Sequence, residues 1–251
     1  MGFPVGIGGG ANESLHNRPL ADQYSKDTSM IYQHRLLSQA GSESLDLPVG
    51  KVVCVGRNYA AHAAELNNPV PAEPILFMKP ATAVVSLENG WSIPTDQGDC
   101  HIETEMTLLI GSQLSKANEQ QALAAILGVG IGFDLTLRDV QTQLKQQGHP
   151  WERAKAFDGS CPLSSFVDAT GFELSDAQLR LTRNGELQQD GNSADMITPV
   201  AKLLALISQQ FTLMPGDVVL TGTPAGVGAI QAGDLLEAEL NQQLKVECRV
   251  R

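Results

Sequence analysis

Short apolar runs separated by turn residues dominate the hydrophobic pattern of this chain. Runs of roughly four to eight apolar or alternating residues, bounded by glycine, proline or polar residues, are typical of strands. By this criterion we predict a hairpin around Asn241 near the C-terminus and strands at KVVCVG (51–56), ILFMKP (75–80), HIETEMTLLIG (101–111), VGIGFDL (129–135) and VVL (218–220). The segment HIETEMTLLIG alternates polar and apolar residues at its start, as expected of a strand with one face on a polar cavity.

Helices are fewer and shorter in the same pattern. We predict them at 62–66, at 118–127, at 136–147 and from the Thr198–Pro199 pair to Gln210. The first is too short to be stable alone, so we interpret it as a lid that orders over a ligand. Because strands outnumber helices without regular alternation, we predict an α+β fold, a mixed and mostly antiparallel β-roll with short peripheral helices.

The domain organisation follows from where this pattern begins. Residues 1–29 include GIGGGANES and little periodic apolar pattern, so we interpret them as a flexible extension of a kind that cloning can add. Residues 30–251 fit one domain, because a β architecture of this length can share a single core. Hydrophobic residues make up 42% of the chain, which is enough to form that core.

Charge and cysteine usage narrow the range of partners. The formal net charge of -11 argues against nucleic acid and anionic membranes, because both are bound through basic surfaces. An anionic substrate would then need a local cluster of lysine, arginine and metal. The four cysteines form no CxxC pair, and the sequence shows neither a membrane-length apolar run nor a signal peptide. We therefore expect a cytoplasmic protein with reduced thiols.

Three carboxylates form the first candidate site. Glu103 and Glu105 are two residues apart on a predicted strand, so their side chains share a face and repel each other unless a cation lies between them. Taken alone, this pair is better explained as an exposed polar strand face. Asp134 changes the balance, because it ends a glycine-rich apolar run where an unpaired charge is costly. Three carboxylate ligands suit Mg²⁺ or Mn²⁺ better than zinc.

A histidine and a glutamate form the second candidate site. His62 and Glu65 are three residues apart on the predicted short helix, where the carboxylate can orient the imidazole as a general base. The alternative is a surface contact that contributes about 0.2–0.5 kcal/mol. The polar residues before the helix favour a functional role, and we include Arg57 and Tyr59 among the candidate substrate-binding residues.

Further polar side chains could contact an anionic substrate. Lys155 has aromatic neighbours in WERAKAFD, where a partly desolvated ammonium can stabilise an enolate, although a single lysine is more often a solvated surface residue. Arg138 either clamps a substrate carboxylate or pairs with Asp139. The loop LTGTPAGVG offers backbone N–H groups and the hydroxyls of Thr221 and Thr223 as a cradle for a carboxylate.

Seven segments together resemble the fumarylacetoacetate hydrolase family in its order and spacing: GRNYAAHAAEL, EPILFMKP, HIETE, GFDLTLRDVQ, GHPWERAKAFDGSCP, NGELQQDG and VVLTGTPAGVG. The resemblance extends from about Met30 to the C-terminus. It is greatest to small single-domain members that act as acylpyruvate hydrolases or as oxaloacetate decarboxylases or tautomerases. It implies the β-roll named above, commonly as a homodimer. Ile102 departs from the family pattern, which often has a second histidine at this position.

The resemblance also implies roles for the candidate residues. The family's metal ligands, usually for Mg²⁺ or Mn²⁺, correspond to Glu103, Glu105 and Asp134. The lid dyad that activates water in the acylpyruvate hydrolases corresponds to His62 and Glu65. Groups that line the reacting carbonyl or contact the substrate correspond to Gln141, Lys155 and Thr223, and less closely to Arg57 and Arg138.

We therefore predict a divalent-metal-dependent hydrolase that cleaves a carbon–carbon bond in acylpyruvates or related β-keto acids, with a small anionic keto acid as its substrate. His62 would deprotonate water, and the metal and Lys155 would stabilise the pyruvate enolate. The same enolate site could decarboxylate oxaloacetate or interconvert its keto and enol forms. A metal- or carboxylate-binding protein without catalysis is the remaining alternative, and the intact His62, Glu65 and Lys155 argue against it.

Overall fold

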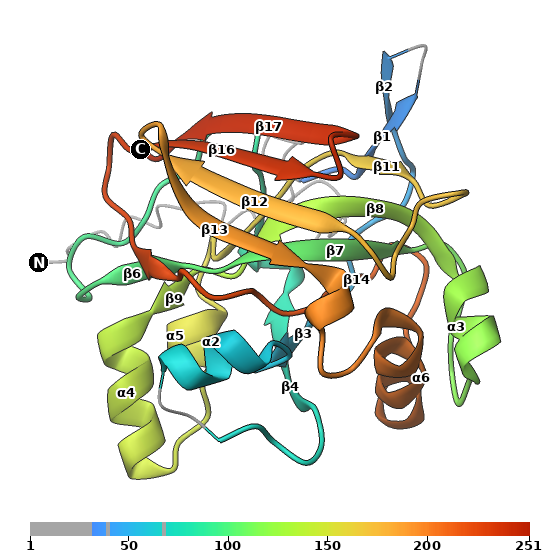
Figure 1. Cartoon of the computed structure of the whole chain (residues 1–251), viewed down its shortest axis with the longest axis horizontal. Coiled ribbons are helices and arrows are strands. Elements are labelled where there is room, and N and C mark those ends of the chain that lie inside the picture. The colour runs from blue at the N-terminus through green and yellow to red at the C-terminus, as the bar shows by residue number, and fades with distance from the viewer. Residues whose placement is uncertain (1–31, 39–40, 67–68) are drawn as a thin grey trace, which may run out of the picture. The chain divides into compact units, whose positions relative to one another are not determined.

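The apolar runs of the sequence form the central strands of a large mixed sheet (Figure 1). The computed structural model describes residues 32–38, 41–66 and 69–251, and the extension predicted at 1–29 lies outside them. The sheet has the order β2-β1-β11-β8-β7-β14-β3-β4, and β10 joins β5 to β8. Its strands are β1 (Arg35–Ser38), β2 (Gly41–Ser44), β3 (Lys51–Gly56), β4 (Ile75–Pro80), β5 (Val84–Ser86), β7 (Thr104–Ile110), β8 (Ile126–Phe133), β10 (Cys161–Leu163), β11 (Phe166–Asp168) and β14 (Val218–Leu220).

Two smaller sheets complete the architecture. One has the order β13-β12-β16-β17 and lies against the large sheet, where β12 contacts β7 and β16 contacts β8 (Figure 1). The other has the order β15-β6-β9. Their strands are β6 (Cys100–Ile102), β9 (Thr136–Leu137), β12 (Gln178–Arg183), β13 (Glu186–Asn192), β15 (Gly228–Ala229), β16 (Leu235–Leu240) and β17 (Leu244–Arg249).

Strand pairing is mostly antiparallel. Among the described strands, the parallel pairs are β1–β11, β3–β14 and β5–β10. All residues of β7 are buried, including the polar Thr104, Glu105 and Thr107, and the sheet of β12 and β16 covers one face of the β7–β8 pair. Strand β17 instead alternates buried and exposed residues, as an outer strand should. The predicted α+β, mostly antiparallel fold is confirmed.

Short helices lie at the periphery of the sheets, as predicted. α4 and α5 contact each other and β9, whereas α3 and α6 contact each other; Figure 1 shows these two groups on opposite sides of the view, with α2 beside α4 and α5. A capping box between Asn118 and Gln121 begins α3, and Gly148 ends α4 in a left-handed conformation. The bounds are α2 (Ala60–Glu65), α3 (Glu119–Ala124), α4 (Arg138–Gln147), α5 (Glu152–Lys155) and α6 (Val200–Gln210), with 3₁₀ turns at Ala81–Ala83 and Ser193–Asp195.

Several predicted elements have different bounds in the structure. The strand expected at 129–135 spans Ile126–Phe133, and the helix expected at 62–66 spans Ala60–Glu65. The strand expected at 101–111 is divided into β6 and β7, because the chain leaves one sheet and joins another at Glu103. The helix expected at 136–147 begins two residues later, because its first two residues pair with β6 as strand β9. The helix expected at 118–127 ends at Ala124, and the chain then enters β8.

The N-cap of helix α6 lies one residue later than the Thr198 cap that was predicted, and the helix itself begins at Val200. Pro199 is at the N-cap position, and no side chain caps the helix. The backbone N–H of Thr198 instead donates a hydrogen bond of 2.8 Å to the side-chain oxygen of Asn58, which joins the start of α6 to the segment before α2. None of the described helices is long and apolar enough to cross a membrane.

Candidate active site

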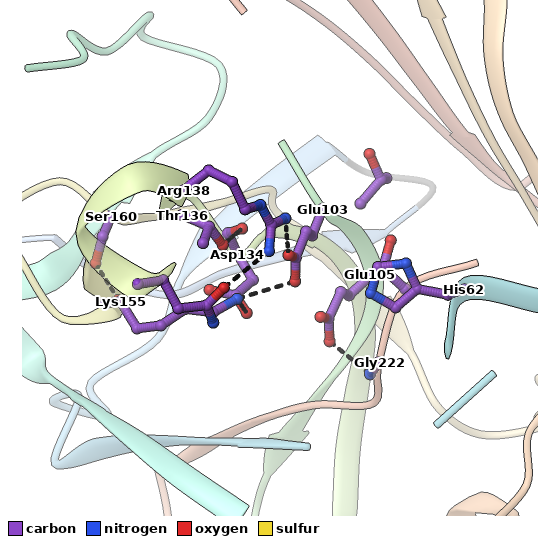
Figure 2. A network of polar contacts seen from close by, with 12 residues as sticks. His62, Glu103, Glu105, Asp134, Thr136, Arg138, Lys155, Ser160 and Gly222 are labelled. Atoms are coloured by element: carbon purple, nitrogen blue, oxygen red, sulfur yellow. Dashed lines mark hydrogen bonds and ion pairs between the residues drawn. The ribbon is translucent and has the colours of Figure 1, made fainter. Parts of the chain in front are cut away.

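Glu103, Glu105 and Asp134 converge where β6, β7 and β8 meet (Figure 2). One carboxylate oxygen of each lies within 4.8 Å of the others, and all three residues are buried. Backbone pairing fixes this arrangement. The Asp134 N–H donates a 2.9 Å hydrogen bond to the Glu103 carbonyl, and Glu105 is paired with Gly132 on β8. The two glutamates therefore share one side, although Glu103 lies outside both strands.

Three cations surround two of these carboxylates. The Lys155 ammonium lies 2.9 Å from Oε2 of Glu103 and 2.6 Å from Oδ2 of Asp134. Arg138 contacts the other oxygen of Glu103 at 2.7 Å, and Lys79 forms an ion pair of 2.8 Å with Oδ1 of Asp134. Lys155 is only 3% exposed, so it is a buried member of this network and no solvated surface lysine.

Burial and ion pairing act in opposite directions on these charges. Burial on its own raises the pKa of Glu103, but the charges of Lys155 and Arg138 outweigh it and hold that pKa below its ordinary value. Burial lowers the pKa of Lys155, whereas Asp134 and Glu103 raise it, and the pKa of this ammonium ends above its ordinary value. Lys155 and Glu103 are therefore both charged at neutral pH.

Glu105 is the member of the trio that has no cationic partner within 4.0 Å among the described residues. Its carboxylate accepts a hydrogen bond of 2.5 Å from the backbone N–H of Gly222. Burial raises the pKa of Glu105 well above its ordinary value, and the neighbouring charges of Asp134 and Glu103 raise it further. A divalent cation would remove this repulsion, and three carboxylate oxygens are donors that Mg²⁺ and Mn²⁺ accept. The donor set thus fits such an ion.

Lys79 is a residue of this network that the sequence interpretation missed. It lies on β4 and is 0% exposed. Besides its ion pair with Asp134, its ammonium donates to the Ser160 carbonyl at 3.0 Å, to the Ser160 hydroxyl at 3.2 Å and to the Lys155 carbonyl. The signal was one lysine within an apolar strand, since a charge at such a position needs a buried partner.

A pocket opens beside the carboxylates and brings most of the predicted residues together. Those that line it are Arg57, His62, Glu103, Glu105, Arg138, Gln141, Lys155 and Thr223. Tyr59 is 3% exposed, belongs to the hydrophobic core and pairs with Met196. It does not line the pocket, so the geometry gives no support to its predicted substrate contact.

Both residues of the predicted dyad lie on α2, and of the two only His62 lines this pocket. His62 is 5% exposed, and its Nδ1 lies 3.4 Å from Oε2 of Glu65, near the upper limit for a hydrogen bond. Glu65 also accepts from the backbone N–H of Gly226, with contacts of 3.1 and 3.3 Å. This second contact fastens α2 to the glycine-rich loop. The water-activating role of the dyad stays a prediction.

Arg138 does not form the ion pair with Asp139 that was one of its two expected contacts. It donates to Glu103 and to the side-chain oxygen of Gln141 at 2.9 Å. Asp139 instead accepts a hydrogen bond of 3.2 Å from the backbone N–H of Asp99. The guanidinium is thus held against the carboxylate trio, where it also faces the pocket.

Gln189 on β13 positions Thr223 and was not predicted. Its amide donates to the Thr223 hydroxyl at 2.8 Å and to the Pro224 carbonyl at 3.0 Å. Its side-chain oxygen accepts from the backbone N–H of Thr104, between the two glutamates, at 3.0 Å. Because the Thr223 hydroxyl accepts this hydrogen bond, its own proton can be donated to a ligand in the pocket. Among the described residues, the competing acceptor is the Pro224 carbonyl, at a long 3.4 Å.

The fold and this site together define a class of protein. A mostly antiparallel β-roll that holds buried carboxylates beside lysine and arginine can bind a divalent cation and an anionic ligand in one pocket. Residues 51–251 match the family model described as fumarylacetoacetate (FAA) hydrolase C-terminal. The chain belongs to this family of enzymes, as its sequence motifs predicted.

Proteins named as oxaloacetate tautomerases and a protein named as a fumarylpyruvate hydrolase are similar to this chain. Oxaloacetate tautomerase YcgM of Escherichia coli is 51% identical over 208 residues, which cover 82% of this chain and 94% of that protein. The mitochondrial oxaloacetate tautomerase FAHD1 of Homo sapiens is 36% identical over 200 residues, with coverages of 79% and 90%. A fumarylpyruvate hydrolase from Pseudomonas aeruginosa, solved in complex with Mn²⁺ and pyruvate, has a TM-score of 0.79 and 34% identity over 87% of this chain and 95% of that one.

Proposed function

We propose that this protein is a divalent-metal-dependent oxaloacetate tautomerase that interconverts the keto and enol forms of its substrate. The observation that carries the proposal is the carboxylate trio beside Lys155 in the pocket, in a chain that is 51% identical to an oxaloacetate tautomerase. The two forms differ by one proton, which moves between C3 and the 2-oxo oxygen. A catalyst must therefore stabilise the enolate that lies between them.

Fixed positive charge in the pocket can stabilise that enolate. When bound by the three carboxylates, Mg²⁺ or Mn²⁺ supplies a Lewis acid for the 2-oxo oxygen. Lys155 is held in place by its ion pairs with Glu103 and Asp134, so its charge needs no reorganisation when the enolate forms. Arg138, held by Glu103 and Gln141, adds a second cation to the same wall.

Other pocket residues bind the substrate and exchange the proton. Thr223 presents its hydroxyl proton to a substrate carboxylate, because Gln189 occupies the acceptor side of that hydroxyl. His62 lines the pocket, and the two ring nitrogens of an imidazole can accept and donate a proton, so it can exchange a proton at C3. Water that enters the pocket can carry out the same exchange.

Hydrolysis of acylpyruvates is the second candidate function, and the contact between His62 and Glu65 favours it. In this reaction the imidazole takes a proton from water, and the resulting hydroxide adds to the distal carbonyl. The carbon–carbon bond then breaks, and its electron pair leaves on the enolate of pyruvate, which Lys155 would stabilise as above. Protonation of that enolate at carbon releases pyruvate.

Assays with metal-stripped protein, reloaded with Mg²⁺ or Mn²⁺, separate these candidates. The ultraviolet absorbance of enol-oxaloacetate follows tautomerisation, and pyruvate release from oxaloacetate or acetylpyruvate follows decarboxylation or hydrolysis. We expect metal-dependent acceleration of enol decay above the solution rate. If the protein hydrolyses acetylpyruvate but does not accelerate the decay of enol-oxaloacetate, it is a hydrolase and the proposed function is wrong. If it turns over neither compound, it binds a metal or a carboxylate without catalysis.

A further inference from the structure

Two cations in the pocket take no part in the ion pairs around the carboxylates. Arg57 and Lys145 line the same pocket as Arg138 and Lys155. Within residues 32–38, 41–66 and 69–251, neither has a carboxylate partner closer than 4.0 Å, whereas Arg138 and Lys155 both do. Arg57 makes one long contact of 3.4 Å with the Pro69 carbonyl. Two uncompensated cations that face one cavity provide a place for an anion.

An aromatic wall connects Lys145 to the carboxylate trio. The Lys155 ammonium lies 5.2 Å from the centre of the Phe77 ring, and that ring lies 6.1 Å from the ring of Trp151. The Lys145 ammonium in turn lies 5.4 Å from the centre of the Trp151 ring. The wall therefore has a positive charge at each end, Lys155 at the carboxylates and Lys145 away from them. A ligand that lies along it meets both.

The cations that line this pocket repel one another. Partial desolvation in the pocket lowers the pKa of Lys145, and the charges of Arg57, Arg138 and Lys155 lower it further, while Glu103 acts in the opposite direction. An anion placed among them would relieve this repulsion. The chain as a whole has a net charge of -11, so the positive field is a local property of the pocket.

We infer that Lys145 and Arg57 form a subsite for the distal carboxylate of a 2-oxo dicarboxylate whose 2-oxo acid end lies at the carboxylate trio. The inference rests on the proposed function for the position of the 2-oxo acid end, and it narrows the substrate class. Oxaloacetate carries such a second carboxylate, whereas acetylpyruvate ends in an uncharged methyl ketone. Lys145 is thus a specificity-determining residue that favours dicarboxylates.

The variant Lys145→Gln tests this subsite with oxaloacetate and its 4-methyl ester, which lacks only the distal charge. Lys145 is exposed, so solvent screens its charge, and we expect kcat/KM for oxaloacetate to fall about tenfold, mainly through KM. The ester should lose less than about threefold, because it has no charge for the lysine to bind. Lys145→Arg should restore the preference. Lys202→Gln is the matched control, because it removes an exposed lysine on α6 outside the pocket.

Binding of stable ligands to the Mg²⁺-loaded protein separates this inference from the proposed function. Calorimetric titration of Lys145→Gln should show about tenfold weaker affinity for 2-oxoglutarate and little change for 2-oxobutanoate. If the wild-type protein turns over no oxaloacetate but shows this selective loss, the proposed function fails and the subsite stands. If tautomerisation is present but both ligands weaken equally, or neither does, the subsite is refuted.

Discussion

Replacement of Lys79 by methionine tests how far buried ion pairs hold the site together. The lysine is fully buried, its ammonium lies 2.8 Å from Asp134, and it donates to the Ser160 carbonyl at 3.0 Å. Methionine fills similar space without charge or donors, so Asp134 loses one of its two cations, and the carbonyls of Ser160 and Lys155 each lose a donor. Removal of one partner from a buried pair costs roughly 3–5 kcal/mol. Because Lys155 still pairs with Asp134, we expect a loss of about 3 kcal/mol.

Thermal unfolding in the presence of a chelator measures this loss without a contribution from bound metal. For a chain of this size each kcal/mol shifts the melting temperature by about 2–4 °C, so Lys79→Met should melt about 6–12 °C below wild type. Lys245→Met is the control, because its exposed pair with Glu237 at 3.8 Å contributes about 0–1 kcal/mol.

A double variant checks the assigned partner. Lys79→Met combined with Asp134→Asn should lose less stability than the two single losses added, because the amide removes the charge that the lysine balances. A Lys79→Met melting temperature as close to wild type as that of the Lys245→Met control would refute the reasoning, and so would strictly additive losses.

Three further changes test other parts of the structure. Glu105→Gln should weaken Mn²⁺ binding at least about tenfold in calorimetric titrations, because a buried donor oxygen loses its charge; unchanged affinity would contradict its assignment as a ligand. His62→Ala should slow acetylpyruvate hydrolysis about 10²–10⁴-fold but oxaloacetate tautomerisation only about tenfold, since water can exchange protons with a stabilised enolate. Equal losses in the two assays would show that His62 carries the proton in both reactions. Burial lowers the pKa of His34 below 6.5, although its contact with the Gly216 carbonyl opposes this, so the unfolded chain binds more protons and the free energy of unfolding should fall as pH drops below about 6.5. His34→Gln should flatten that part of the pH profile of denaturation midpoints, and an unaltered profile would count against the buried imidazole as its source.

Local pattern predicted several strands with their observed bounds, including the three-residue β14, but it missed others, among them the two-residue β9 and β15. β3 and β4 have the predicted bounds, because Gly56 and Pro80 end apolar runs. Strands of two or three residues, such as β9 and β15, have no measurable period, and their partners lie far along the chain. The β12–β13 hairpin was overlooked despite a usable signal. Asn184 and Gly185 both have positive φ, as expected of an Asn-Gly turn.

The charges of the site were only partly predictable for a related reason. The repulsion between Glu103 and Glu105 on one strand face, together with the cost of an unpaired Asp134 at the end of an apolar run, indicated that these carboxylates converge. A lone lysine within an apolar strand, such as Lys79, indicates that a buried partner exists, but only the tertiary fold shows which residue that partner is. Lys79 and Lys145 were missed, although one pairs with Asp134 and the other lies over Trp151.

The parts of this site lie far apart along the chain, and this affects how the protein folds. Glu105 meets an N–H group 117 residues away in sequence, and Lys155 is 52 residues from Glu103. Closure of such long loops costs entropy before any contact offsets it, whereas the β16–β17 hairpin needs only local contacts. We therefore expect a refolding chain to gain its affinity for a divalent cation after most of its secondary structure has formed. Cation binding would then report the completion of folding.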